Sequence, residues 1–370
     1  MFKRYAIGLL CLASTFGSGS PAIPAETGTS GDISLPTSFA LTTKYRLDYG
    51  DLEGVLRGSV LKMGRSTHKR APKPTKSTAS KIRLGNPLPS RLEGNRVMLH
   101  EYNALQIKGV AGVRDDLSAI PTQLPIEKLS KNEQLAYWLN LHNITVLAKV
   151  AELYPITKLE RLLSPLDTSS EYFSRDYNWN GQMISLADIR SHVLANWDDP
   201  VVIYGFYFGA VGTPNIRNSA YTGTTVYAAL EANAKEFVNS VRGTQIWNKT
   251  KLRVSTYYKA SAEKFPDFEK DLMVHLRKYA DEKFKRRMKN TKDFVANIDD
   301  WHIADLYNGQ FADGAAGVYA GTVTDATGNS LKSALPEHVK DLLKDRQTKL
   351  ARMRSGKTGI EEVTKKEKSR

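Results

Sequence analysis

Apolar residues recur at helical spacing between Ser130 and Ile156, and the rest of the chain is organised around this stretch. Ser130 can cap the helix at its N-terminus, so the pattern predicts a long buried helix. Its unusual feature is polar content, because Asn140, His142 and Asn143 lie inside the apolar run. A polar group buried without a partner costs about 1–3 kcal/mol. We therefore expect these side chains to have protein partners or a ligand.

The pattern on both sides of this helix predicts further elements. Helices are expected late in 45–60 and over 92–110, 159–163, 186–196, 225–241 and 267–288, and strands over 201–208 and 252–256. Asn180-Gly181 predicts a hairpin turn, and Ser185 can cap the helix after it. Two prolines favour a loop over 117–129. Together these elements predict a helix-rich α+β single domain with a small, mostly antiparallel sheet.

Composition along the chain predicts four parts. Residues 1–25 resemble a secretory signal peptide, with Lys3 and Arg4 followed by an apolar run too short to span a bilayer comfortably. Residues 26–38 are rich in Thr, Gly, Ser and Pro, as in a disordered lead-in. The domain is expected over 39–310, and a low-complexity, then basic charged tail over 311–370. These features predict a secreted or periplasmic protein without a transmembrane span after signal removal.

Cysteine content restricts the chemistry. Cys11 is the only cysteine, so a mature chain beginning at Glu26 would have no disulfide, thiolate metal site or cysteine nucleophile. No His-Glu-x-x-His motif is present, and Ser355 to Thr358 lacks the first glycine of a phosphate-binding loop. We therefore predict no metal and no cofactor.

The formal net charge is +14, or +12 without Lys3 and Arg4. Nine Lys or Arg and no acid lie in the basic loop 62–91, and the chain from Lys332 carries twelve Lys or Arg against six Asp or Glu. Export makes an anionic envelope polymer or lipid headgroups a more plausible partner than nucleic acid. The alternative is a solvated loop and a solubilising tail.

Several motifs occur in an order that resembles the uncharacterised family called domain of unknown function 547. Residues 136–144 are similar to its A-F-W-I-N-L-Y-N-A motif, and residues 185–191 take the place of S-L-D-D-I-E-H. Residues 208–221 correspond to a loop of the form C-x-S-I-G-C-P-x-L-R-N-x-A-Y, and Asp300-Trp301 to a late aspartate and tryptophan. The similarity covers about residues 39–307.

A Cys, His and acid set in this family would imply a papain-like or transglutaminase-like thiol site. This sequence departs from that set, because Phe208 and Thr213 replace the two loop cysteines and His192 lies one position after the family histidine. The resemblance therefore implies a cleft without the ancestral chemistry. If catalysis remains, the candidate residues are Thr213, His192 and His142. His142 replaces a family tyrosine and could equally be a hydrogen-bonded core histidine.

Candidate ligand-binding residues lie on the central helix and on the Gly-Pro loop. Asn140 and Asn143 share one helix face and could bind a ligand or hold a loop by its backbone. Arg217 could grip a carboxylate or phosphate, or pair with an acid such as Asp188. The remaining candidates are Asn218 and Tyr221, the latter also explicable as packing.

Three functional hypotheses follow from these residues. The first is an exported cell-envelope protein, non-catalytic or catalytically altered, that binds a ligand in the cleft. The second is a hydrolase or acyltransferase that uses Thr213 or His192 with His142. The third is a polyanion or anionic-lipid surface binder that acts through residues 62–91 and the tail.

Overall fold

The computed structural model describes residues 33–73, 86–247, 250–291, 293–310, 323–324, 330–331 and 335–367. The expected signal peptide lies outside these residues, as do Cys11 and the middle of the basic loop. The chain separates into a short unit, Met1–Ser34, and a large unit, Leu35–Arg370.

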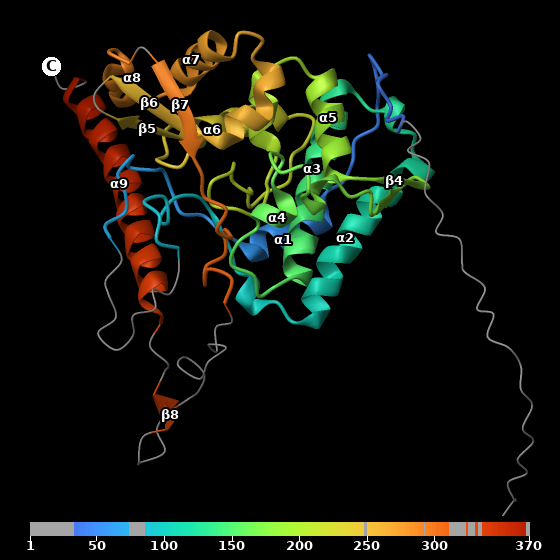
Figure 1. Ribbon diagram of the computed structural model, residues 1–370, viewed down its shortest axis with the longest axis horizontal. Coiled ribbons are helices and arrows are strands. Elements are labelled where there is room, and N and C mark those ends of the chain that lie inside the picture. The colour runs from blue at the N-terminus through green and yellow to red at the C-terminus, as the bar shows by residue number, and fades with distance from the viewer. Residues whose placement is uncertain are drawn as a thin grey trace, which may run out of the picture. The chain divides into compact units, whose positions relative to one another are not determined.

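Helix α3 (Lys131–Glu152) is the predicted central helix, and every residue from Glu133 to Ala151 is buried. Its cap is confirmed, because the Glu133 N–H donates to Ser130 Oγ at 3.3 Å. Figure 1 shows α3 within the large unit, with α2 and α5 beside it. A helix covered on all sides by protein explains why its apolar pattern extends around the whole circumference.

The other helices vary in length, and α2, α5 and α6 pack against α3. The α-helices are α1 (Gly50–Ser59), α2 (Ala104–Gln123), α4 (Glu160–Leu163), α5 (Leu186–Asn196), α6 (Val226–Val238), α7 (Phe268–Tyr279), α8 (Glu282–Met288) and α9 (Glu337–Glu367). The 3₁₀ helices are η1 (Leu99–Glu101), η2 (Ile126–Lys128), η3 (Glu171–Phe173), η4 (Pro200–Gly205) and η5 (Thr256–Lys264). The expected Ser185 cap is present, since its hydroxyl accepts from the Asp188 N–H.

The sheets are small and mostly antiparallel. The strands are β1 (Val60–Leu61), β2 (Arg96–Val97), β3 (Tyr177–Trp179), β4 (Gln182–Ile184), β5 (Thr244–Trp247), β6 (Lys251–Ser255), β7 (Asp293–Ile298), β8 (Val323–Thr324) and β9 (Ser330–Leu331). Only the β6–β7 pair is parallel among the strands that the structure describes. Asn180 and Gly181 form the predicted turn between β3 and β4, with φ of 50° and 80°. The helix-rich α+β class is therefore confirmed.

The strand predicted over 201–208 is wrong, because residues 200–205 form the 3₁₀ helix η4. Asp199 caps this helix by accepting from the Val201 N–H at 2.9 Å, and Pro200 occupies its first turn. A short apolar run that is buried on all sides has no periodicity to separate a strand from a helix. The β-branched composition favoured the wrong alternative.

The predicted helix over 92–110 and the loop over 117–129 are also misplaced. Helix α2 begins only at Ala104, because Asn103 and Gln106 form a capping box, and it continues through Pro121. Proline cannot donate to the carbonyl four residues earlier, which is that of Leu117. The Tyr137 hydroxyl donates to this carbonyl at 3.0 Å. A side chain of α3 thus compensates for the proline inside α2.

The helix predicted over 267–288 is two helices, α7 and α8. The chain is extended at Ala280, and Asp281 caps α8 by accepting from the Phe284 N–H at 2.7 Å. The Asp281 N–H in turn donates to Asn239 Oδ1. After this break, Lys283 and Arg287 of α8 line a cavity together with residues 65–69.

Helix α9 packs along one side of the large unit beside the early basic loop (Figure 1). Val339 and Leu342 of α9 form a buried cluster with Met63 and Leu306. Further along, the Arg346 guanidinium donates to the Lys62 carbonyl at 2.7 Å. The described start of the tail and the described start of the basic loop are therefore in direct contact.

Candidate functional site

The two asparagines of the central helix hold main-chain groups far away in sequence. Asn140 donates to the Tyr221 carbonyl at 2.8 Å and accepts from the Tyr221 N–H at 2.9 Å. Asn143 donates to the Gly205 carbonyl and accepts from the Tyr207 N–H. Each side chain thus makes the pair of bonds that a neighbouring peptide would make, which is the loop-holding role expected as one alternative.

His142 is fully buried in an aromatic cage. Its ring lies against Phe206 and Phe208, with centroid distances of 4.9 and 5.5 Å, and Nδ1 lies 3.2 Å from Asn143 Oδ1. Nε2 is buried without a hydrogen-bond partner among the described residues. Burial lowers the pKa of His142 to about 3. The ring is therefore neutral at physiological pH.

His192 and Thr213 have contact partners different from those of His142, and different from each other. His192 packs against Trp138 and Trp197, and burial lowers its pKa to about 4. The Thr213 hydroxyl is buried and donates to the Ala210 carbonyl at 2.9 Å. No hydrogen bond between described residues joins Thr213 to either histidine.

Arg217, Asn218 and Tyr221 follow the Gly-Pro loop as expected. Arg217 donates to the Ala229 carbonyl and to Ser219 Oγ, whereas Asp188 is bound by Arg175. The suggested Arg217–Asp188 pair is therefore wrong. Tyr221 is buried, and the cavity beside it, lined also by Asn140 and Asn143, has a volume of about 10 Å³. A space of this size holds at most about one water molecule.

Asp300 ties the loop 209–221 to the end of the basic loop. Its buried carboxylate accepts from Asn86 Nδ2 at 3.0 Å, from Ser90 Oγ at 2.5 Å and from His302 Nδ1 at 2.9 Å. Its backbone carbonyl accepts from the Gly212 N–H at 2.7 Å. A Cβ at Gly212 would fall 2.7 Å from that same oxygen, so the close approach requires glycine. The sequence motif that contains Asp300 resembles the family pattern but assigns it no role.

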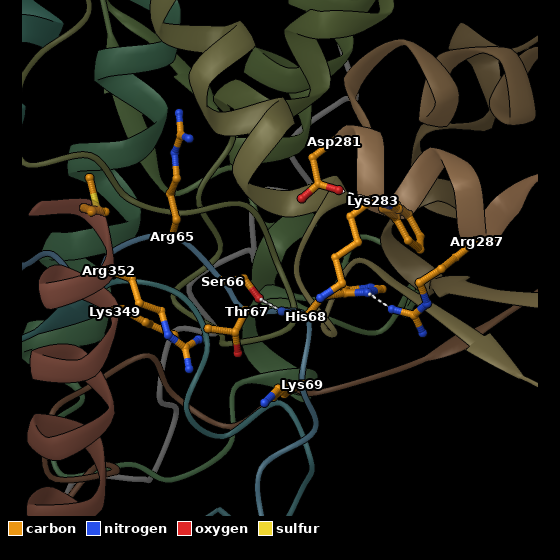
Figure 2. A pocket seen from close by; sticks show the side chains of 12 residues that line it. Arg65, Ser66, Thr67, His68, Lys69, Asp281, Lys283, Arg287, Lys349 and Arg352 are labelled. Carbon is orange, nitrogen blue, oxygen red and sulfur yellow. Dashed lines mark hydrogen bonds between the residues drawn. The ribbon is translucent and has the colours of Figure 1, made fainter. Parts of the chain in front are cut away.

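A cavity of about 730 Å³ lies between the basic loop, α8 and α9. Figure 2 shows Arg65 to Lys69 running between α9 on one side and α8 on the other. We call this space the cation pocket, because six of its twelve lining residues are Lys or Arg and only one is an acid. The six are Arg65, Lys69, Lys283, Arg287, Lys349 and Arg352.

Carboxylates of the described residues neutralise only part of this positive charge. Lys349 is paired, with Asp345 at 2.7 Å and Glu93 at 3.6 Å. Arg65, Lys283 and Arg287, by contrast, have no ion pair with any carboxylate that the structure describes. Like charges held in one concave space repel one another, so an anion that enters it is attracted by their summed field.

His68 orients one wall of the cation pocket. Its ring packs edge-on against Phe284 at 4.4 Å, and Nε2 lies 2.9 Å from the Thr244 carbonyl, which can only accept. That contact places the proton on Nε2, so Nδ1 is the acceptor for Arg287 Nη1 at 3.0 Å. Burial lowers the pKa of His68, which keeps the ring neutral in this role. The Arg287 guanidinium is thus fixed without losing its charge.

The sequence predicts the basic loop and the basic tail, but it does not predict that both line one cavity with α8. The outer face of residues 267–288 is visibly basic, yet nothing in the sequence shows that the chain turns at Ala280. His68 gave no signal, since it lies in an irregular segment with a φ of 53°.

The large unit is a helix-rich α+β fold with a cavity of only about 10 Å³ beside the central helix and a separate cation pocket. Residues 126–238 match the model of a family described as a protein of unknown function, DUF547. No curated protein and no solved structure matches the chain. The matched segment includes α3 and the loop 209–221, whereas every residue that lines the cation pocket lies outside it.

The described residues contain neither a membrane-spanning helix nor a metal-binding cluster. None of their helices is long and apolar enough to cross a membrane. No group of three or more His, Cys, Asp or Glu among them is placed to hold a metal ion.

Proposed function

We propose that this chain is an exported binding protein of the cell envelope that takes anionic polymers in its cation pocket. The observation that carries the proposal is the convergence of Arg65, Lys283 and Arg287 from two segments more than 200 residues apart, without carboxylate partners among the described residues. Such clusters bind phosphate or carboxylate groups and release the counter-ions of the polymer.

A non-catalytic role is supported by the closure of the family cleft. The Thr213 side chain is buried and its hydroxyl is committed to a carbonyl, while His142 is sealed from solvent. A cavity of about 10 Å³ beside Asn140 leaves no room for a substrate. A serine- or threonine-directed electrophile is therefore expected to leave Thr213 unlabelled.

Export is supported by Lys3, Arg4 and the apolar run that follows them, with small residues before Glu26. In an envelope without nucleic acid, the anions available to the cation pocket are those of wall polymers and lipid headgroups. Protein recovered from an envelope fraction is expected to begin at Glu26, as read by mass spectrometry of its N-terminal peptide.

The direct test measures binding of fluorescently labelled inorganic polyphosphate by anisotropy across a salt series. The variant Arg65→Ala/Lys283→Ala removes two exposed cations of the pocket. We expect it to weaken binding about tenfold or more and to reduce the salt slope by about one for each side chain that contacts a phosphate.

The matched control is Lys108→Ala/Lys128→Ala, which removes the same charge from exposed positions outside the pocket. This control lowers the long-range electrostatic attraction for polyphosphate as much as Arg65→Ala/Lys283→Ala does. Its affinity for polyphosphate is expected to stay within about twofold of the wild-type value. Equal losses in both double variants would show a diffuse charge effect and overturn the cation pocket as the site.

A further inference from the structure

A second cavity adjoins the cation pocket and has a different character. Its volume is about 210 Å³, and it shares the lining residues Arg65 and Met353 with the cation pocket. The two spaces therefore meet at those side chains. The remaining wall of the second cavity contains four asparagines, Asn95, Asn215, Asn218 and Asn233. We call it the amide pocket.

Two of these asparagines, Asn95 and Asn215, hold the wall of the amide pocket in place through hydrogen bonds. The Asn95 side chain accepts from the Met63 N–H at 3.2 Å and donates to the Ile216 carbonyl at 2.9 Å. Asn215 Oδ1 accepts from the Asn95 N–H at 2.8 Å. These bonds join the basic loop to the loop 209–221 across more than 100 residues of sequence. The amide pocket is therefore held open by the protein in advance of a ligand.

Another part of the set is uncommitted. The Asn218 side chain and Asn215 Nδ2 make no hydrogen bond to any residue that the structure describes. The one acid of the amide pocket, Glu236, is engaged with the Arg242 guanidinium. An uncommitted amide offers both a donor and an acceptor, which is the combination that a sugar hydroxyl pair requires. Arg217 adds a cation beside them.

We propose that the ligand of these two adjoining pockets is an anionic glycan, whose acidic groups occupy the cation pocket while a sugar ring occupies the amide pocket. This assignment rests on the proposed function and adds the chemistry of the polymer. The 210 Å³ space lies below the range for drug-sized ligands, about 300–1,000 Å³, and fits a single ring.

Other polyanions fit the two pockets less well. Single-stranded nucleic acid binds through bases stacked on aromatic rings. Phe284, the one phenylalanine, tyrosine or tryptophan that lines either pocket in the described chain, is buried beneath His68. An acyl chain requires an apolar channel, which a wall with four asparagines does not provide. An acidic peptide remains as the competitor that the experiment must exclude.

The test compares two hexamers with equal charge, hexagalacturonate and hexaglutamate, by isothermal titration calorimetry at fixed salt. We expect hexagalacturonate to bind at least about tenfold more tightly, which corresponds to about 1.4 kcal/mol. Asn218→Ala is expected to weaken hexagalacturonate binding about three- to tenfold and to leave hexaglutamate within about twofold. Asn290→Ala, an exposed asparagine that lines neither pocket, is the matched control.

The outcomes separate the two proposals. Equal affinity for the two hexamers, or a preference for hexagalacturonate that survives Asn218→Ala, overturns the glycan assignment. If polyphosphate still binds, the cation pocket remains the proposed anion-binding site. Tighter binding of hexaglutamate identifies an acidic peptide and also overturns it. Failure of both hexamers and of polyphosphate overturns the proposed function itself.

Discussion

At the scale of single residues, His142 determines a pH dependence of stability. Burial lowers its pKa to about 3 from the usual 6.5, so the folded chain keeps the ring neutral. The stability contributed by the neutral ring is complete above about pH 6.5. It is lost as pH falls toward 3, because the unfolded chain takes up a proton that the folded chain does not. We expect His142→Phe to reduce the slope of unfolding free energy against pH by about one proton, near 1.4 kcal/mol per pH unit.

Urea unfolding at several pH values between about 4 and 6 measures this slope. His142→Gln, a second neutral replacement, should reduce the slope equally even if its absolute stability differs. The slope should not vanish, since burial also lowers the pKa of His192 and of His275 to about 4. A wild-type slope in both variants would show that His142 is protonated in the folded chain.

What the sequence could predict about single residues was their need for partners, not the identity of those partners. Asn140 and Asn143 stood out because they lie in an apolar run, and the structure gives both of them backbone partners. Those partners lie 81 and 62 residues away. Such distances depend on the complete fold, so no local pattern could supply them. The uncommitted state of Asn218 is equally invisible in the sequence.

At the scale of elements, a buried ion pair fixes α9 to the large unit. Lys349 is 2% exposed, donates to the Leu92 carbonyl and lies 3.6 Å from Glu93. Burial raises the pKa of Glu93, and Lys349 opposes that rise. Removing one partner of a buried pair leaves the other charge without compensation, at a cost of about 3–5 kcal/mol. We therefore expect Lys349→Met to release α9, seen as faster hydrogen exchange over residues 340–353.

Two further variants test the cause of that release. Glu93→Gln/Lys349→Met removes both charges, so it is expected to recover much of the lost protection. Lys344→Ala, an exposed position five residues earlier in α9, should exchange like the wild type. Equal exchange in Lys349→Met and Lys344→Ala would mean that apolar contacts such as Val339 hold α9 without the ion pair.

Elements with a clear period or a side-chain cap were predictable, and those decided by distant contacts were not. The α3 helix, the Asn180-Gly181 hairpin and the Ser185-capped helix follow from local signals. The segment 201–208 has no period, so burial alone could not define its geometry. At Pro121, inside α2, Tyr137 supplies the missing donor to the Leu117 carbonyl from another helix. Each error therefore arises where tertiary contacts override local preference.

At the scale of the whole molecule, the cation pocket joins segments that the sequence keeps far apart. The cations of the basic loop, of α8 and of α9 repel one another. Apolar packing between the start of the basic loop and α9, and the Lys349–Glu93 ion pair, oppose this repulsion. An anion bound among them removes this repulsion and so stabilises their common arrangement. By mass action, a ligand at 100 times its dissociation constant adds about 2.7 kcal/mol to the free energy of unfolding.

We therefore expect polyphosphate to slow hydrogen exchange in residues 62–73, in α8 and in α9 together, and to raise the melting temperature. Both effects should decline as salt rises, since the Debye length falls from about 10 Å at 0.1 M to about 3 Å at 1 M. Arg65→Ala/Lys283→Ala should lose protection in all three segments at once. Protection confined to one segment would show that the three bind anions separately, and that their meeting in the fold is not a single site.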